Sequence, residues 1–495
     1  MDNKARVYAA IEAYIKQQMQ RLRIPGLVMA IVEGDQIVHQ RGFGRAHPGG
    51  APPTPQTPFM IGSLSKSITA LAILQLVEGG KIELDAPVQR YLPWFRVADP
   101  QASAQMSVRH LLNQTSGMPW LASEIALDDY DENPAATERQ VRALASLKLK
   151  RPVGAAFEYS NFNFNILGLV VEAASGLSYT DYIQKHIFKP LEMQHSYTSR
   201  AEAVENGLAA GHRYWFGHPI PAGDMPFSYS SLPSGQLIAS AEDMAHYLIA
   251  HLNGGQYQNV QILSPTGIDE LHSGVIDYIV FGKPVGKYGM GWFEIDLGKT
   301  KTYSHGGNVP DFSAFMALIP EQKKGLVLLL NADPYGLPPV IEELGMGATA
   351  LLAGQQPPPV RLDFIKWLFH LLPLIPILQI LGMVTTFRRL KRWEREPDSR
   401  PSSGRLLRQH LLLPLIPNLS LAGMNNTLRS SGAIRFIQLF WPDLALIIRT
   451  SGDLAGKWAV LRTLLVLRSL RKFANSANKK REPCDEQAKQ ELPAG

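Results

Sequence analysis

Cysteine is nearly absent from this sequence, whose 495 residues include only Cys484. A single cysteine excludes an intramolecular disulfide and any metal site built from several cysteine thiolates. A secretory signal peptide is also lacking, because residues 1–23 are polar and contain no long apolar run. Charged residues make up 19% and hydrophobic residues 45%, which excludes a mainly disordered chain. We expect neither a metal ion nor an organic cofactor.

The charges are unevenly distributed along the chain. Residues 1–387 contain 29 Lys and Arg against 34 Asp and Glu, a net charge of −5. Residues 388–495 contain 20 against 9, a net charge of +11. Basic segments beside apolar runs indicate anionic lipid as a partner. No nucleic-acid recognition motif accompanies the positive charge, so we do not expect nucleic acid as a partner. The oligomeric state is not predicted.

Hydrophobic periodicity predicts an α+β domain over residues 5–354. Apolar residues recur at helical spacing in some segments, and short apolar runs bounded by turn residues occur in others. Strands near both ends of a helical middle indicate one unit of roughly 350 residues. The predicted helices are 5–22, Ser63 to the Gly79-Gly80 pair, 108–112 and 163–175, and the predicted strands are 27–32, 36–42, 287–295, 302–304, 313–319 and 325–331.

The composition changes after residue 354. Residues 355–363 include three consecutive prolines and are predicted to be a linker. Trp367 to Phe387 is a run of 21 residues without a formal charge, long enough to cross a bilayer of ~30 Å. The alternative is a buried core helix in a soluble protein. We predict a membrane region at 364–473, with spans at about 367–387 and 409–428, a third span at 433–448 left open, an amphipathic basic helix at 454–473 and a disordered tail at 474–495.

The charge of the tail also predicts an orientation. The basic run that begins at Arg388 places the following loop in the cytoplasm. Residues 1–363 then lie outside the cell, and we predict a membrane protein with an extracytoplasmic N-terminal domain. Export of a domain of this size normally requires a signal sequence. Either a segment upstream of Met1 supplies one or the charge rule is overridden, and the sequence does not decide between them.

Gly62-Ser63-Leu64-Ser65-Lys66 begins a long stretch with helical periodicity. A serine in the first turn of a helix lies near unpaired backbone N–H groups, which stabilise developing negative charge. A lysine three residues later projects from the same face and can reach the serine hydroxyl. When such a lysine is partly desolvated it can act as a base. The same spacing recurs at Ser469 to Lys472, so the spacing alone does not establish a site.

Tyr159-Ser160-Asn161 provides a second element. A tyrosine close to Ser63 and Lys66 can shuttle the hydroxyl proton, because nearby cationic charge lowers its pKa. The Asn161 amide can orient a substrate carbonyl or the lysine. A half-buried core tyrosine is the alternative, and Tyr257 to Asn259 has the same spacing in a loop.

The third element is His305-Gly306-Gly307, followed by Asn308. Glycines in a strand let a substrate lie against its edge with little obstruction. The backbone N–H of Asn308, paired with that of Ser63, can form an oxyanion hole. A loop histidine beside glycines is the alternative.

Taken in order, the three motifs resemble the serine β-lactamase and penicillin-binding protein superfamily. The resemblance is strongest to its branch of class C β-lactamases, D-alanyl-D-alanine peptidases and family VIII carboxylesterases, and it covers about residues 8–352. It implies a β-lactamase-like fold, with an antiparallel sheet flanked by helices and a helical subdomain, followed here by C-terminal transmembrane helices. Other segments that resemble this branch are 24–26, 80–88, 110–117, 233–244 and 288–292.

The resemblance implies a role for each motif residue. Ser63 is the acylated nucleophile, Lys66 its basic partner and Tyr159 the general base. Ser63 and Asn308 supply the oxyanion N–H groups. The implied substrate-binding residues are Asn161, His305, Gly306, Gly307 and Asn308.

His305 departs from the class C pattern, which has lysine at this position. A histidine is mostly neutral at pH 7 and is therefore a weaker partner for a substrate carboxylate. We expect a membrane-anchored serine hydrolase that cleaves a small-molecule or peptide ester or amide, with weak β-lactamase activity left open. The alternatives are a penicillin-binding receptor or sensor that does not turn over its ligand, and a soluble esterase whose tail only packs as helices.

Overall fold

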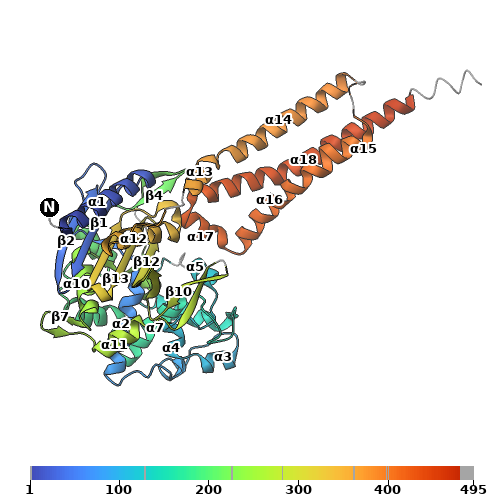
Figure 1. Ribbon diagram of the computed structural model, residues 1–495. Coiled ribbons are helices and arrows are strands. Elements are labelled where there is room, and N and C mark those ends of the chain that lie inside the picture. The colour runs from blue at the N-terminus through green and yellow to red at the C-terminus, as the bar shows by residue number, and fades with distance from the viewer. Residues whose placement is uncertain are drawn as a thin grey trace, which may run out of the picture. The chain divides into compact units, whose positions relative to one another are not determined.

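The computed structural model describes residues 3–126, 130–223, 227–280, 282–359, 363–396, 399 and 401–479. The chain forms two compact units, Met1–Ile365 and Lys366–Gly495 (Figure 1). The first unit is built around one large antiparallel sheet with helices, which confirms the predicted α+β fold class for this part of the chain. The described part of the second unit is helical.

An eight-stranded sheet forms the centre of the first unit, in the order β2-β1-β14-β13-β12-β11-β10-β9. The N-terminal hairpin therefore pairs with the last strand in the chain, and every pairing is antiparallel. β13 and β14 are buried along almost their whole length, as their continuous apolar runs predict. The strands are β1 (Gly26–Glu33), β2 (Gln36–Gly44), β9 (Ile276–Val280), β10 (Lys283–Tyr288), β11 (Phe293–Leu297), β12 (Thr300–Val309), β13 (Phe312–Ile319) and β14 (Lys324–Leu330).

Helices cover both faces of this sheet because alternate strand residues point to opposite sides. Met316 of β13 belongs to the large core that includes Leu71 of α2 (Ser65–Glu78) and Leu248 of α10 (Ala241–Leu252). Phe315 instead lies against Gly345 of α12 (Pro338–Leu352), where a Cβ would overlap its ring. α12 in turn packs on α1 (Asn3–Leu22).

Five of the remaining helices of the first unit, α4, α5, α6, α8 and α11, pack against α2 or α7. α2 is buried on nearly all sides, and its low polarity identifies it as a central core helix. α7 packs directly against it. The helices are α3 (Pro100–Gln105), α4 (Val108–Leu112), α5 (Trp120–Ile125), α6 (Ala136–Ala143), α7 (Asn161–Ser175), α8 (Tyr179–Ile183), α9 (Arg200–Glu205) and α11 (Pro265–His272), and the short strands are β3 (Phe59–Met60), β4 (His212–Trp215), β5 (His218–Pro221), β6 (Ile238–Ala239), β7 (Gln256–Tyr257) and β8 (Val260–Gln261).

Several predicted boundaries are wrong. The strand predicted at 302–304 is the ten-residue strand β12, which continues through the His305-Gly306-Gly307 motif to Val309. The segment predicted as one strand at 287–295 is the end of β10 and the start of β11, separated by a turn that contains Gly291. Gly291 has a φ of +83°, and a Cβ there would lie 2.8 Å from the Cα of Ser67, so the turn requires glycine. The helix predicted from Ser63 begins with a 3₁₀ turn, η1 (Gly62–Leu64), and continues as α2. α7 begins at Asn161 instead of residue 163.

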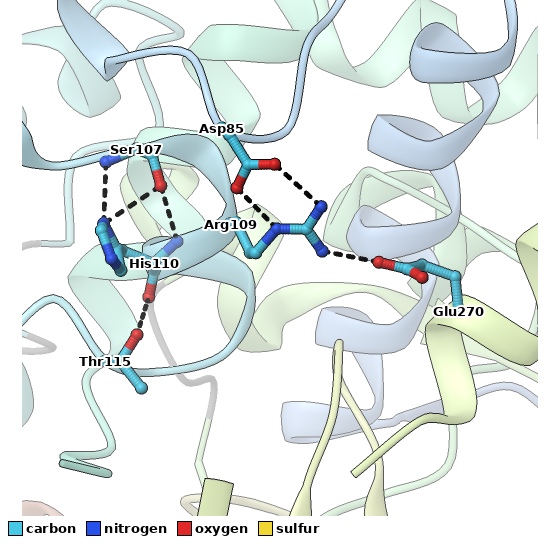
Figure 2. A network of polar contacts seen from close by, with 6 residues as sticks. All are labelled: Asp85, Ser107, Arg109, His110, Thr115 and Glu270. Carbon is cyan, nitrogen blue, oxygen red and sulfur yellow. Dashed lines mark hydrogen bonds and ion pairs between the residues drawn. The ribbon is translucent and has the colours of Figure 1, made fainter. Parts of the chain in front are cut away.

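A polar network anchors α4 (Figure 2). Arg109 donates to both carboxylate oxygens of Asp85, at 2.7 and 3.1 Å, and to Oε1 of Glu270 on α11 at 2.6 Å. At the start of α4, Ser107 Oγ accepts from the His110 backbone N–H, while the His110 ring accepts from the Ser107 N–H. This reciprocal capping and the bidentate arginine pair fix the loop that follows α4.

The second unit consists of helices in its described residues. α14 and α16 both pack on α18, and a small apolar cluster around Leu390, Trp393 and Val466 lies between helices of this unit. The helices are α13 (Asp363–Leu371), α14 (Leu374–Arg395), α15 (Ser403–Leu406), η11 (Leu407–Leu412), α16 (Leu413–Ser430), α17 (Ala433–Phe440) and α18 (Pro442–Lys479).

Within the described residues, one helical stretch is long and apolar enough to cross a membrane, Lys366–Arg395, and 11% of its most apolar window is buried. It consists of the end of α13 and all of α14, joined by a turn at 372–373. It contains the predicted span at 367–387. The segment 409–428 is helical but does not pass the same test, and it stays a prediction. The open third span at 433–448 is not one helix, because the chain breaks at Trp441.

The last two predictions for the tail concern α18. Residues 454–473 are helical, as predicted, but they form the middle of this longer helix. The tail predicted to be disordered from residue 474 starts inside α18, so its first six residues are helical. Residues 480–495 lie outside the described part of the chain.

Candidate active site

Ser63 lies in the 3₁₀ turn that precedes α2, beside the strand β12. Gly62 has a φ of +55°, and a Cβ on it would lie 2.7 Å from the backbone nitrogen of Asn308. On β12, Gly307 is equally close to the serine turn, because a Cβ on it would overlap the carbonyl oxygen of Ile61. Two glycines therefore allow the turn and the strand to approach closely. Ser63 remains partly exposed between buried neighbours.

Lys66 is fully buried in the first turn of α2 and reaches back to Ser63. Its Nζ donates to Ser63 Oγ at 3.0 Å, to Asn161 Oδ1 at 2.7 Å and to the carbonyl oxygen of Ser234 at 2.6 Å. These three contacts account for all the donors of an ammonium group. The lysine side chain is therefore held in one position with its nitrogen against the serine hydroxyl.

Glu124 of α5 is the neighbour of this lysine that the sequence analysis missed. Its Oε1 accepts a hydrogen bond of 3.0 Å from Asn161 Nδ2, so Asn161 bridges a buried carboxylate and a buried lysine. Burial lowers the pKa of Lys66 to about 7, and the charge of Glu124 opposes this shift. Burial also raises the pKa of Glu124, against the charge of Lys66. The lysine can therefore lose its proton near neutral pH.

The Tyr159 hydroxyl also contacts Ser63 Oγ. It donates a hydrogen bond to this oxygen at 2.8 Å, and Lys66 Nζ lies 4.8 Å from the centroid of the tyrosine ring. The predicted lowering of the tyrosine pKa is wrong. The ring is partly accessible, but its surroundings desolvate the hydroxyl, and this burial raises the pKa well above its ordinary value. Tyr159 is therefore a proton donor in this structure.

The loop after α4 holds Tyr159 in place. Gln114 Oε1 accepts from the backbone N–H of Ser160 at 2.9 Å and from the side chain of Asn163. The backbone carbonyl oxygen of Gln114 accepts from the N–H of Glu158 at 2.8 Å. The backbone on both sides of Tyr159 is thus fixed to Gln114, which lay inside the 110–117 segment of the resemblance but was given no role there.

β12 carries the third motif and changes its pairing beside Ser63. Its pairing with β11 ends at Ser304, opposite Phe293, whereas its pairing with β13 continues to Val309. Residues 305–308 therefore have no partner strand on the β11 side. A free strand edge next to a nucleophile can accept an extended substrate through backbone hydrogen bonds.

His305 is buried, with 2% of its surface exposed, and it is not a cation in this site. Burial and the nearby Lys66 lower its pKa to about 3. This agrees with the prediction that the histidine is neutral at pH 7. Its Nδ1 lies 2.6 Å from the carbonyl oxygen of Gly306, and its Nε2 has no partner among the described residues. Its ring centroid lies 5.2 Å from that of Phe293 and 6.4 Å from that of Tyr159.

The Asn308 side chain is directed away from a substrate role. Its Nδ2 donates to Oδ1 of Asp333 at 2.8 Å, and Asp333 is buried. This hydrogen bond fixes the end of β12, while the Asn308 backbone nitrogen lies against Gly62 next to Ser63. The structure therefore brings the two predicted oxyanion donors to neighbouring positions.

All eight predicted site residues lie around Ser63 Oγ or along the adjacent strand. The two duplicate motifs do not. Ser469 Oγ donates to the carbonyl oxygen of Leu465, and Lys472 pairs with Glu394. Tyr257 lies in β7 beside His246, with ring centroids 4.9 Å apart. Within the described residues no group of three or more His, Cys, Asp or Glu side chains could hold a metal ion.

Comparison with known proteins identifies the family of this chain. The model of the Beta-lactamase family matches residues 11–344. Protein flp of Staphylococcus aureus (strain MW2) is 29% identical over 338 residues, which cover 68% of this chain and 65% of that protein. Penicillin-binding protein 4 of Amycolatopsis lactamdurans is 29% identical over 317 residues, covering 62% of this chain and 81% of that protein.

A solved structure is similar over the same region. The octameric penicillin-binding protein homologue from Pyrococcus abyssi superposes with a TM-score of 0.60 and 30% identity, covering 72% of this chain and 78% of that one. The match to Protein flp covers 65% of the length of that protein, which is less than two thirds. The resemblance seen in the motifs is confirmed, and the chain belongs to the Beta-lactamase family of serine hydrolases and penicillin-binding proteins.

Proposed function

We propose that this protein is a membrane-anchored serine hydrolase that cleaves an ester or amide through an acyl-enzyme on Ser63. The observation that carries the proposal is the convergence of two proton-transfer groups on one oxygen. Lys66 Nζ lies 3.0 Å and the Tyr159 hydroxyl 2.8 Å from Ser63 Oγ. Such a nucleophile with a neighbouring base and a second proton carrier is the arrangement that acyl transfer requires.

Lys66 is the base in the proposed acylation. In its neutral form it accepts the Ser63 hydroxyl proton, and the oxygen forms a bond to the substrate carbonyl carbon. The negative charge that develops on the carbonyl oxygen is stabilised by the backbone N–H groups of Ser63 and Asn308. Loss of one such donor reduces transition-state stabilisation by ~2.7–4 kcal/mol in comparable sites.

Tyr159 completes the step as a proton donor. Its hydroxyl is protonated and gives its proton to the leaving group as the bond between carbonyl carbon and leaving group breaks. The proton held by Lys66 then restores Tyr159. A water molecule takes the place of the leaving group in the second half of the reaction, and the same groups act in the reverse direction to release the acid and free Ser63.

The neutral His305 favours an ester or a peptide over a β-lactam as the substrate. A β-lactam presents a carboxylate, and a permanent cation at the position of His305 would bind it. The pKa of His305, about 3, leaves that position uncharged at every physiological pH. β-Lactams are therefore expected to acylate Ser63 slowly, if at all, compared with an activated ester.

Membrane attachment is supported by the helix Lys366–Arg395. Its apolar side chains are largely exposed within its own unit, for example Leu378 at 64% and Leu381 at 54%. Exposed apolar helices of this length are stable in lipid and unfavourable in water. The basic residues that follow favour the proposal that this end meets the anionic leaflet.

The proposal is tested by labelling and turnover. A fluorophosphonate should label the wild-type chain and not Ser63→Ala, and a chromogenic short-chain ester should be hydrolysed for many turnovers. Equal labelling of both proteins would remove the assignment of Ser63. Labelling of Ser63 by a fluorescent penicillin without turnover of any ester in a panel that includes nitrocefin and D-Ala-D-Ala peptides would favour a receptor instead.

A further inference from the structure

Glu342 of α12 lies beside the free edge of β12 and has no part in the steps above. A Cβ on Gly306 would lie 3.1 Å from Cγ and 3.4 Å from Oε1 of Glu342. Because Gly306 has no side chain, the carboxylate lies close to the strand backbone. Gly306 is also one of the residues that β11 leaves without a partner.

The carboxylate of Glu342 lacks a compensating charge. Within the described part of the chain it has no hydrogen bond or ion pair, and burial raises its pKa to about 7. A desolvated carboxylate without a cation is unfavourable, and such groups are concentrated at functional sites. The negative charge of Glu342 also contributes to the raised pKa values of Tyr159 and Tyr278, so these two rings are its titratable neighbours.

Among the described residues at this edge, the other polar groups provide no permanent positive charge that is available to Glu342. Lys66 directs its three donors to Ser63, Asn161 and Ser234. His305 is buried and neutral, and its Nε2 has no partner among the described residues. Within the described part of the chain, a substrate on this edge therefore meets the carboxylate of Glu342 and neutral rings.

We propose that Glu342 forms a subsite for a cationic group, an ammonium or quaternary amine, on the leaving-group side of the substrate. This inference rests on the proposed function, because it places a substrate at Ser63. The leaving-group side is assigned because Glu342 lies against Gly306, and the ring of the adjacent His305 lies 6.4 Å from that of Tyr159, the group that protonates the leaving atom. A cation bound there replaces the missing counter-charge, whereas a substrate carboxylate is repelled.

Three acetate esters with the same acyl group test the inference on the full-length protein. Acetylcholine has a cationic leaving alcohol, 3,3-dimethylbutyl acetate is its neutral isostere, and 3-acetoxypropionate is anionic. Hydrolysis of each is followed by acid release. The expected kcat/KM is at least tenfold higher for acetylcholine than for the neutral ester, and lower again for the anionic ester.

Two variants identify Glu342 as the cause. Glu342→Gln, which keeps the shape, should reduce the ratio of acetylcholine to the neutral ester about tenfold. Glu342→Lys should favour the anionic ester. Glu343→Gln removes the neighbouring carboxylate of α12 and should keep the wild-type ratio. Thermal unfolding of each variant checks that the fold is intact.

The same ratio has a pH dependence with a defined sign. As pH falls through 7, Glu342 becomes protonated and neutral, so the preference for acetylcholine should decline. Tyr159 and Tyr278 titrate far above this range and His305 far below it. Lys66 titrates near the same pH, but it affects both esters equally and cancels in the ratio.

The outcomes separate this inference from the proposed function. A ratio near one that Glu342→Gln leaves unchanged, with all esters hydrolysed by Ser63, overturns the cationic subsite alone. A preference for acetylcholine that persists in Glu342→Gln also overturns it. No hydrolysis of any ester and no fluorophosphonate label on Ser63 overturn the proposed function itself.

Discussion

At the scale of single residues, the charge state of Lys66 controls the proposed chemistry. An exposed lysine holds its proton at neutral pH and cannot accept one from serine. Burial opposes that charge, while Glu124, connected through Asn161, favours it. These two opposing effects bring the pKa of Lys66 close to neutral pH, where the lysine can both accept a proton and return it. The activity should therefore decline as pH falls through about 7, because protonated Lys66 is no longer a base.

Glu124→Gln tests this balance. Glutamine retains an oxygen for Asn161 Nδ2 but has no charge, so the pKa of Lys66 should fall further. The acidic limb of the kcat/KM profile for a p-nitrophenyl ester should move to lower pH by roughly one unit. Glu138→Gln, which removes an exposed carboxylate paired with Arg142 on α6, should leave the profile in place. An unchanged profile in Glu124→Gln would show that its charge does not act on the lysine.

Gly62→Ala tests the close approach of the serine turn to β12. The added Cβ would lie 2.7 Å from the Asn308 nitrogen and 2.8 Å from the carbonyl carbon of Gly307, at a φ of +55°. The turn must move away from the strand, which separates Ser63 from its second oxyanion donor. We expect kcat to fall about 100-fold, since misplacement by ~1 Å has that effect in other enzymes. Gly80→Ala, also at positive φ but with open space around it, should leave kcat near that of the wild type.

At the scale of elements, the sequence predicts most of the sheet because its central strands are continuous apolar runs. β1, β13 and β14 are each predicted within about two residues. β9 is missed because it is an edge strand whose side chains alternate between partly exposed and exposed, so no apolar run marks it. The split between β10 and β11 is missed for a different reason. The chain must approach α2 at Gly291, and that contact is a tertiary one.

The site shows the same division between local and tertiary signals. Ser63 and Lys66 are predicted because three residues on a helix bring side chains to one face. Tyr159 is found by its motif, but its role as donor depends on the burial of its hydroxyl by distant segments. Glu124 and Glu342 carry no local signal, since each meets the site only through folding. Carboxylates that reach a motif only in the folded chain cannot be identified without the three-dimensional contacts.

Gln114→Ala tests whether the loop after α4 positions Tyr159. The variant loses the oxygen that accepts from Ser160 and Asn163, leaving two buried donors without a partner. This should reduce the free energy of unfolding by about 1–3 kcal/mol and lower kcat more than KM changes. Gln114→Glu keeps an acceptor and should restore most of the rate. Full activity in Gln114→Ala would mean that the tyrosine is held by other contacts.

At the scale of the whole molecule, the chain joins a negatively charged part that carries the β-lactamase-like fold to a basic C-terminal part. Residues 1–387 have a net charge of −5 and residues 388–495 a net charge of +11. Composition therefore predicted an N-terminal part in water and a C-terminal part at a membrane. The two compact units divide after Ile365, close to the predicted linker. The number of spans did not follow from composition. Most of the uncharged run 409–428 forms α16, which is helical but does not pass the test for a membrane span.

Two lysines in α14 distinguish a membrane anchor from a helix that packs in water. Leu378 and Leu381 are exposed within their unit, so Leu378→Lys combined with Leu381→Lys removes no internal packing. Each lysine opposes insertion of a helix centre by roughly 2.5–3.5 kcal/mol, and together they should release the chain from membranes washed with alkaline carbonate. Wild type should stay in the pellet, as should Val204→Lys, which alters an exposed apolar residue of α9. Wild type in the supernatant would contradict the anchor, because a peripheral protein is extracted by carbonate whereas a spanning helix is not.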